Sequence, residues 1–585
     1  MENSKNVLIA IVLSAAIIIL WTVFVQGPQM ERQQAQTEAQ QAAQQAQQAQ
    51  QQQGQQAAPQ DAGRQVVSRE AALQQGPRVT IDNPRVTGSI NLKGGRIDDL
   101  VLKEYRETIQ PTSPNIVLLS PLDTEQAYYA DFGWSAAGPD IATPGKDTVW
   151  RADGTALSPG NPVTLTWENG QGLTFARRFE VDPDYMFTIT DTVTNTSGAA
   201  VEIAPYGRVV RYGTPKDASQ MWVLHEGPTA VLDGSLKEHS YGSVRDEAED
   251  GAKYTYTSTG GWMGISDKYW LVSQIPPQDE TLTSNMFYDP KGDFYQVDFA
   301  SAQRAVPPGG NVTRTQHLFA GAKLVNMLDS YGERLGLPLF DRAVDFGWFF
   351  FLTKPLFLIL DWIYRFVGNF GVAILFLTVL VKAAMFPLAN KSYRSMSKMK
   401  VLGPKMTELR EKYGNDRARI NQEMMELYKR EKVNPAAGCL PILVQIPVFY
   451  ALYKVLFVTI EMRHAPFFGW IKDLSAPDPT SIFNLFGLIP WDYHQVFQIP
   501  LLGGLLVFLS IGIWPLIMGF TMWAQMRLNP TPPDPVQARL FALMPIIFTF
   551  MLAPFAAGLI IYWAWNNTLS IAQQRLIMWR MGVKP

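Results

Sequence analysis

A lysine inside a long apolar run is the residue of this chain best placed for binding chemistry. The run extends from Gly371 to Leu388, and Lys382 is its single charged residue. A run of this length is a candidate transmembrane helix, and lipid cannot solvate an ionisable group within it, so Lys382 is a candidate functional residue. Its chemistry would be electrostatic, because a fixed ammonium attracts carboxylates and repels cations. The alternative is snorkelling, in which the lysine stem carries the charge to the headgroups.

Other apolar segments carry polar residues that could join Lys382. Thr378 lies four residues before it, so the two share one face of a helix. Because polar groups in lipid need partners or water, a common hydrated cavity is one solution, and hydrogen bonds that only join the helices are the other. Lys454, nine residues after Gln445, lies on the opposite helix face and is expected to snorkel. The polar residues are Gln445 on one segment and Asn566, Asn567 and Ser570 on the last.

The polar half of the chain offers no comparable cluster. Its histidines, His225, His239 and His317, have neither metal-ligand spacing nor a paired cysteine. The tripeptide Gly145-Lys146-Asp147 resembles the end of a phosphate loop, but the upstream glycine is misplaced and the Ser or Thr is missing. The single cysteine, Cys439, excludes an intramolecular disulfide. We therefore expect a protein that is not an enzyme and that uses no cofactor and no metal.

Apolar segments and charges predict the elements that position these residues. After a segment at 7–25, others fall at 346–366, 370–388, 438–459, 499–524, 539–554 and 557–578. Residues 389–434 carry twelve Lys and Arg against six Asp and Glu, which favours a cytoplasmic location. In 346–366, Lys354, Asp361 and Arg365 form one polar stripe opposite aromatic bulk, which is typical of an interfacial helix. The pattern predicts six membrane spans, without 346–366, and both termini in the cytoplasm.

The first half of the chain predicts an anchor, a tether and a β-domain. Segment 7–25 is longer than a usual signal-peptide core, and no small-residue cleavage site follows it. This pattern indicates an uncleaved signal anchor. Residues 33–60 are almost entirely Gln and Ala, a composition typical of a disordered tether. From about Arg78 to Leu318, apolar residues alternate with polar ones between turn signals, which predicts one large β-sandwich outside the cytoplasm.

The basic loop is predicted to form a helical hairpin. Apolar residues recur at spacings of three and four on both sides of Gly414-Asn415-Asp416, which supplies a helix stop and a new N-cap. A solvated hairpin that only satisfies the positive-inside rule would explain the charge excess of six, but not two amphipathic helices. The apolar positions are Met399, Leu402, Met406, Leu409, Tyr413, Ile420, Met424 and Leu427.

Three stretches of the second half resemble a known family. They are FPLANKSYRSMSKMKVLGPKM, which begins at Phe386, NPAAGCLPILVQIPVFYALY, from Asn434 to Tyr453, and DPVQARLFALMPIIFTFMLAPFAAGLIIYW, which begins at Asp534. Over about residues 340–580 the chain resembles the YidC/Oxa family of membrane protein insertases, and its first half resembles the Gram-negative bacterial branch. The resemblance implies an α-helical polytopic membrane protein. It would have a five-helix insertase core plus an N-terminal signal anchor, and a large extracytoplasmic β-supersandwich domain similar to galactose mutarotase.

The resemblance also implies a function and site residues. Members insert and fold integral inner-membrane proteins, alone or with the Sec translocon, through a hydrophilic groove open to cytoplasm and lipid. The groove residues of the family correspond here to Lys382, Thr378, Gln445, Asn567 and Tyr562, whereas Trp563 stands where a second tyrosine is common. The implied partners are nascent membrane proteins, the Sec translocon and its accessory subunits, ribosome or signal-recognition targeting complexes, and lipids. No specific recognition of nucleic acid is expected.

Two other functions remain open on the sequence alone. A secondary transporter would need broken helices in two repeated halves, and no internal repeat is visible. A membrane-anchored carbohydrate-binding or mutarotase-like protein would place its chemistry in the β-domain. The expected parts are the anchor 1–25, the tether 26–76, the periplasmic domain 77–321, a linker with the interfacial helix 322–369, the core 370–578 with its hairpin 390–434, and a cytoplasmic tail 579–585.

Overall fold

The computed structural model describes residues 66–582 except 137, 139, 217, 219–223, 250–252, 415, 432, 434–439, 490–509 and 530–534. The predicted signal anchor and most of the predicted tether therefore lie outside the described residues. The end of that tether is structured, because α3 (Arg69–Leu73) follows Ser68, whose hydroxyl accepts a hydrogen bond from the Ala71 amide. The chain forms two compact units, and the larger one consists of residues 66–531 and 542–585.

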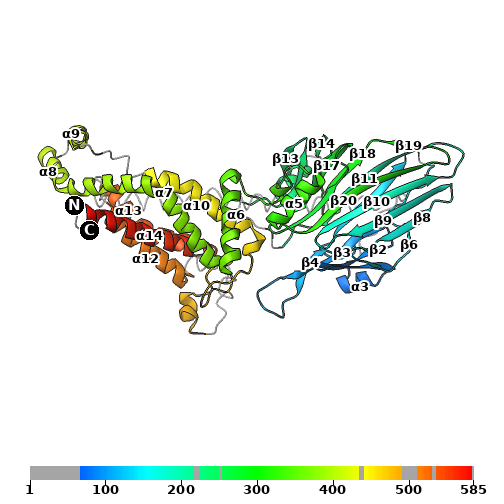
Figure 1. Ribbon diagram of the computed structural model, residues 1–585, viewed down its shortest axis with the longest axis horizontal. Coiled ribbons are helices and arrows are strands. Elements are labelled where there is room, and N and C mark those ends of the chain that lie inside the picture. Colours follow the sequence, from blue (N-terminus) through cyan, green and yellow to red (C-terminus); the bar gives the residue numbers. More distant parts are fainter. Residues whose placement is uncertain are drawn as a thin grey trace, which may run out of the picture. The chain divides into compact units, whose positions relative to one another are not determined.

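The predicted β-sandwich is confirmed as two large sheets, antiparallel except where β1 meets β7 (Figure 1). The first sheet has the order β14 (Tyr254–Thr259), β17 (Thr281–Asp289), β18 (Phe294–Ser301), β11 (Val201–Tyr212), β5 (Tyr128–Ala136), β3 (Arg96–Arg106), β2 (Val86–Asn91), β1 (Arg78–Asp82) and β7 (Ala156–Leu157), with β4 (Asn115–Leu119) on β3 and β19 (Arg304–Val306) on β11. The second has the order β13 (Ser235–Glu238), β12 (Gly227–Leu232), β15 (Trp262–Ser266), β16 (Trp270–Ile275), β20 (Asn311–Ala322), β10 (Met186–Asn195), β9 (Leu173–Val181), β8 (Val163–Glu168) and β6 (Arg151–Ala152).

Alternation along each strand explains the core between the sheets. In β9, for example, every second residue from Leu173 to Val181 is buried; four of these residues are apolar, and the fifth, Arg177, pairs with Asp191. A short helix, α4 (Tyr241–Glu249), contacts β17. The fold class predicted from the sequence is thus confirmed for this part of the chain.

The linker after β20 is packed onto the sandwich. It holds α5 (Val325–Leu335) and the 3-10 helix η2 (Phe340–Ala343). The Phe340 ring contacts Trp262 and Phe319 edge to face, with centroids 5.4 and 5.6 Å apart. The hydroxyl of Tyr331 donates to the Asp182 carboxylate at 2.7 Å. The linker therefore folds as part of the β-domain and ends where the helical region begins.

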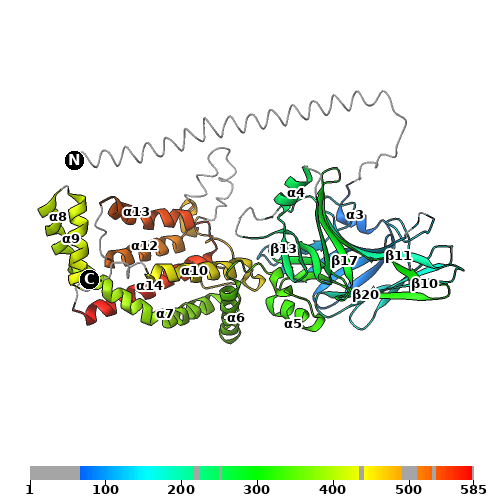
Figure 2. The same ribbon diagram turned by 90° about the horizontal axis from the view of Figure 1, so that it is seen from above.

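The polar stripe of segment 346–366 lies on α6 (Phe350–Val367), whose axis runs across those of the bundle helices (Figure 2). The ammonium of Lys354 pairs with Asp329 and Asp341, each at 2.7 Å, and Asp361 accepts from Asn326. Some of the aromatic side chains are open, since Trp348 and Phe366 are more than 80% exposed, whereas Phe357 is buried. The stripe thus contacts the linker, and the interfacial location of α6 stays a prediction.

Apart from the two helices of the hairpin, the described residues after α6 form five α-helices. They are α7 (Phe370–Val401), α10 (Leu440–Val458), α12 (Ile513–Leu528), α13 (Pro535–Leu552) and α14 (Ala557–Arg580). Among the described residues, α7 is the one helix long and apolar enough to cross a membrane, and Gln445–Val458 and Ala538–Leu552 are shorter apolar stretches. Helix α14 contacts α7, α10 and α12, so the polar residues of these helices can meet. The number and direction of the spans stay predictions.

One segment, Leu474–Thr480, caps two of these helices. The carbonyls of Leu474 and Ala476 accept from the amides of Gly558 and Ala557 at the start of α14, at 3.0 and 2.7 Å. The side chains of Thr480 and Asp478 accept from the amides of Ile513 and Trp514 at the start of α12, both at 2.9 Å. Unpaired amides at helix N-termini need such acceptors, so this segment holds two helix ends together.

The predicted hairpin consists of α8 (Gly403–Tyr413) and α9 (Arg417–Arg430), at the end of α7 farther from α6 (Figure 2). Gly414 ends α8 with a positive φ of 55°, and the Asp416 side chain caps α9 by accepting from the Arg419 amide. An apolar cluster joins the hairpin to α7 and α14. It contains Met399, Leu402, Met424, Tyr428 and Ile577, with Met406, Leu409 and Ile420 packed against it.

Two residues of the hairpin and one residue of segment 438–459 differ from prediction. Met399 belongs to α7, which continues to Val401, and Tyr413 donates to Glu423 from outside the apolar cluster. Lys454 does not snorkel, because its side chain is only 2% exposed and its ammonium pairs with Asp345 at 2.8 Å. That carboxylate comes from the linker before α6, so helix periodicity could not reveal it.

Candidate functional site

A cavity of about 250 Å³ opens among α7, α10, α12 and α14. No Asp or Glu lines it in the part of the chain that the structure describes, and Lys382 supplies the one charge. Its lining is Lys382, Tyr393 and Met396 from α7, Gln445, Ile446 and Phe449 from α10, Gln525 and Asn529 from α12 and its C-cap, and Tyr562, Trp563, Asn566 and Ser570 from α14. The cavity therefore combines a cation with neutral hydrogen-bonding groups and apolar walls.

The Lys382 ammonium reaches across to α14. Its Nζ donates to the Ser570 hydroxyl oxygen at 2.8 Å, and Ser570 in turn donates to the Asn566 carbonyl at 2.8 Å. A lysine stem could carry the charge out to the headgroups, but here the ammonium stays between helices. This arrangement favours the binding interpretation of Lys382 over snorkelling.

Gln445 and Tyr562 form a second bridge in the cavity. The Gln445 amide nitrogen donates to the Tyr562 hydroxyl at 2.8 Å, which joins α10 to α14. Beside it, the rings of Phe449 and Trp563 meet edge to face with centroids 4.6 Å apart. The structure thus brings Lys382, Gln445 and Tyr562 together in one lining.

Thr378 and Asn567 lie outside this lining. Thr378 is 1% exposed, and its hydroxyl donates to the Ile374 carbonyl at 2.6 Å. Asn567 is 3% exposed and donates to the Thr521 hydroxyl at 3.3 Å. Both side chains bond within the bundle, and their role as groove residues stays a prediction.

Several lining residues had not been assigned a role from the sequence. Ser570 and Asn566 were noted only as polar, and Gln525 and Asn529 were missed. The latter two lie four residues apart and therefore share one helix face. That spacing at the end of an apolar segment was the signal that could have found them.

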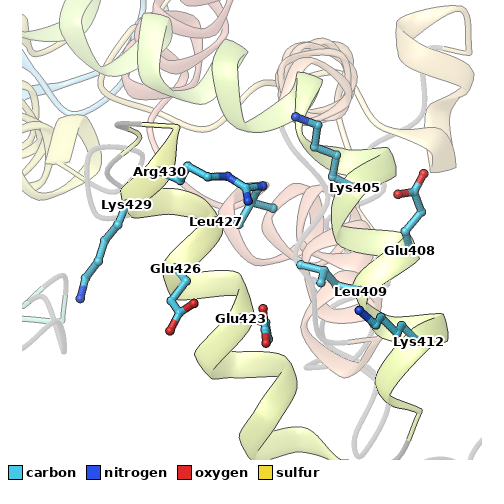
Figure 3. A pocket seen from close by; sticks show the side chains of 9 residues that line it. All are labelled: Lys405, Glu408, Leu409, Lys412, Glu423, Glu426, Leu427, Lys429 and Arg430. Carbon is cyan, nitrogen blue, oxygen red and sulfur yellow. The ribbon is translucent and has the colours of Figure 1, made fainter.

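A larger cleft, of about 680 Å³, lies between α8 and α9 of the hairpin (Figure 3). Charged side chains of both signs surround Leu409 and Leu427, and an ion pair of 3.0 Å between Lys405 and Glu431 links the two helices. The charged lining residues are Lys405, Glu408, Lys412, Glu423, Glu426, Lys429 and Arg430. Such a mixed surface can receive a polar peptide or a protein partner.

Burial or a hydrogen bond within the β-domain accounts for each of its three histidines, as expected for residues with a structural role. Burial lowers the pKa of His225 to about 4, which keeps the ring neutral. His239 bonds the Tyr256 hydroxyl at 2.7 Å, and His317 bonds Thr188 at 3.1 Å. Among the described residues, no group of three or more metal-ligating side chains is found.

Comparisons with known proteins point to one family along nearly the whole chain. The family model described as the YidC periplasmic domain matches residues 78–359, and the model described as 60Kd inner membrane protein matches residues 362–584. The curated protein "Membrane protein insertase YidC" of Brucella suis biovar 1 (strain 1330) is 52% identical, over 100% of this chain and 97% of its own length. The protein of that name from Nitrobacter hamburgensis is 53% identical, over 100% of this chain and 96% of its own length.

Solved structures match this chain at lower sequence identity than the curated proteins do. A structure titled "Active YidC insertase crystal structure with the first transmembrane domain resolved" is 15% identical with a TM-score of 0.34, over 86% of this chain and 95% of that chain. A galactose mutarotase related enzyme from Lactobacillus acidophilus is 10% identical with a TM-score of 0.31, over 42% of this chain and 97% of that chain. At these scores the likeness adds nothing to the sequence comparisons.

Proposed function

The chain belongs to the YidC family of membrane protein insertases, which are not enzymes, and we propose that it inserts integral membrane proteins through the cavity at Lys382. The observation that carries the proposal is the Lys382 ammonium in a cavity whose described lining holds no carboxylate but includes Gln445, Gln525, Asn529 and Asn566. A cation in such a place can attract the acidic groups of a translocating segment, while the neutral groups offer it hydrogen bonds.

The energetics of a translocating segment explain why such a cavity helps. An unpaired polar group costs several kcal/mol in hydrocarbon, and the cavity replaces hydrocarbon by hydrogen-bonding partners over part of the path. The apolar helix of the substrate can then enter the lipid. Outward apolar side chains such as Phe520, Leu516 and Ile546 are 65%, 43% and 55% exposed and suit a lipid-facing surface. This partition supplies the driving force without a nucleotide.

The hairpin is the proposed entrance. Its charge excess, its methionine-rich cluster and the cleft between α8 and α9 support a role in receiving nascent membrane proteins or the ribosome and targeting complexes that deliver them. Methionine side chains adapt to varied apolar partners. Action beside the Sec translocon is proposed from family membership alone.

The proposed location is the inner membrane of a Gram-negative bacterium. The family assignment and the positive charge of residues 389–434 support a cytoplasmic hairpin and a periplasmic β-domain. The proposed topology has six spans and both termini in the cytoplasm.

Photocrosslinking of a stalled nascent membrane protein tests the proposal. Probes at positions 382, 445 and 525, which line the cavity, should crosslink to the substrate. A probe at exposed Thr568, on α14 but outside the lining, should not. A probe at Thr378 decides whether that buried position is exposed during insertion. Equal crosslinking at 382 and 568, or none at 382, 445 and 525, would contradict a substrate path through the cavity.

A further inference from the structure

We propose that Ser570 is a positioning residue for Lys382. It holds the ammonium inside the cavity through a hydrogen bond to a neutral hydroxyl, so this bond does not cancel the positive charge that acidic groups of the substrate would meet. The inference rests on the proposed function, because it concerns how the same cavity selects what passes. It assigns a role to a residue that the sequence noted only as polar.

Ser570 donates a hydrogen bond within its own helix, α14, and accepts one from α7. Its side chain is buried, and its own O–H donates to the Asn566 carbonyl, four residues earlier on α14. The hydroxyl oxygen accepts from the Lys382 ammonium at 2.8 Å, and the Tyr393 hydroxyl, also on α7, is in hydrogen-bond contact with the same Ser570 side chain. A lysine has a long flexible stem, so an acceptor on the facing helix is what keeps its charge at this depth.

Two other lysines of the apolar half show a different arrangement. Lys354 pairs with Asp329 and Asp341, and Lys454 pairs with Asp345. In those pairs a carboxylate cancels the charge, which suits a structural contact. Of the three, Lys382 is the one whose ammonium is bonded to an uncharged hydroxyl in the described structure. A neutral acceptor fixes the position of the cation without neutralising it, which is what an electrostatic selector requires.

The test uses the purified full chain in proteoliposomes and two matched substrates, one with an acidic and one with a neutral translocated tail. Ser570→Ala should insert the acidic-tail substrate roughly tenfold more slowly, the order expected for the loss of one hydrogen bond to a charged group. The neutral tail should be inserted at the normal rate. Ser570→Thr keeps a hydroxyl with the same bond to the preceding turn, so it should restore the acidic-tail rate.

The matched control is Thr568→Ala. Thr568 lies on the same helix and donates to the Ala564 carbonyl at 2.8 Å, as Ser570 does to Asn566, but it is exposed and does not line the cavity. Equal losses on both tails in Ser570→Ala, or the same loss in Thr568→Ala, would overturn the positioning role.

A variant of the cation separates this inference from the proposed function. If Lys382→Gln slows the acidic tail and Ser570→Ala does not, the inference fails while the electrostatic function stands. If Lys382→Gln affects the acidic and the neutral tail equally, the electrostatic role of Lys382 fails and the inference fails with it, whereas crosslinking at positions 382, 445 and 525 still decides whether substrate passes through the cavity. The double variant Lys382→Gln/Ser570→Ala should be no slower than Lys382→Gln, because Ser570 acts through Lys382, and an additive loss would contradict that.

Discussion

The ammonium of Lys454 lies 2.8 Å from a carboxylate oxygen of Asp345, a residue 109 positions earlier in the chain. That same oxygen accepts from the His225 amide at 2.9 Å, and the second oxygen accepts from the Gly347 amide at 3.0 Å. One carboxylate therefore joins α10, which carries Gln445 of the cavity, to the end of the linker and to the β-domain.

The first prediction concerns this ion pair. Lys454→Met or Asp345→Asn alone should each destabilise the protein by ~1–3 kcal/mol, because each change removes one hydrogen bond between charged groups while the remaining partner keeps its other contacts. The double variant should lose less than the sum, and thermal unfolding in detergent measures all three. Additive losses would show that the two side chains do not interact.

The second prediction is a pH dependence at Glu461. Its carboxylate accepts from the Val325 amide at the start of α5 at 3.0 Å, and burial raises its pKa to about 7 from an ordinary value of 4.5. The folded state thus binds the proton more tightly than the unfolded state, so this contribution is fully present below about pH 4.5 and is lost as the pH rises to about 7.

Glu461→Gln should remove that loss, worth up to ~3 kcal/mol, and should stabilise the protein at pH 8 more than at pH 4.5. Glu333→Gln, on an exposed position of α5, is the control and should leave the pH profile of thermal unfolding unchanged. An unaltered profile in Glu461→Gln would refute the prediction.

The third prediction concerns the β-domain. None of the residues that line the cavity comes from it, so deletion of most of residues 80–310 should leave insertion largely intact in a growth-complementation assay. A longer deletion through Asp341 also removes both carboxylate partners of Lys354 and should fail. Loss of complementation by the shorter deletion at normal protein levels would contradict the prediction.

The fourth prediction concerns the hairpin. Removal of residues 396–431 should abolish insertion while the apolar helices remain in the membrane. Because Met396 lines the cavity, a second variant that removes only α8 and α9 and keeps α7 to Val401 separates the hairpin from the cavity wall. It should also be inactive. Full activity of that variant would reduce the hairpin to a topology signal.

The fifth prediction is a charge series at Lys382. Lys382→Arg should be nearly silent, and Lys382→Gln should show a partial defect confined to substrates with acidic tails. Lys382→Glu should be the worst, because it reverses the attraction. Insertion of matched acidic-tail and neutral-tail substrates measures the series. Equal defects on both tails, or Glu as good as Arg, would restore the snorkelling interpretation.

Local patterns predicted much of the fold. The alternation of apolar and polar residues between Arg78 and Leu318 predicted strands with one buried face, such as β9, and Asp416 marked the start of α9. These signals need only neighbours in sequence, because strand and helix periods fix which side chains share a face. The two-sheet sandwich and the helical region follow the predicted fold class.

Pairings across the chain could not be predicted in this way. Ser570 meets Lys382 across 188 residues, and Asp345 meets Lys454 across 109. Thr378 shows the limit of spacing alone, since a four-residue step brings two side chains near one another but does not place both on the cavity. The helix packing decides which of them faces the opening.

The capping segment Leu474–Thr480 also has a consequence for the order of assembly. Its acceptors precede their donors in the chain, since Ile513, Trp514, Ala557 and Gly558 are all synthesised later. As the chain leaves the ribosome, the acceptor groups are therefore present before either helix that they cap. The first residues of α12 and α14 are more than forty residues apart in the chain. Both are capped by the same segment of seven residues, which is synthesised before either helix.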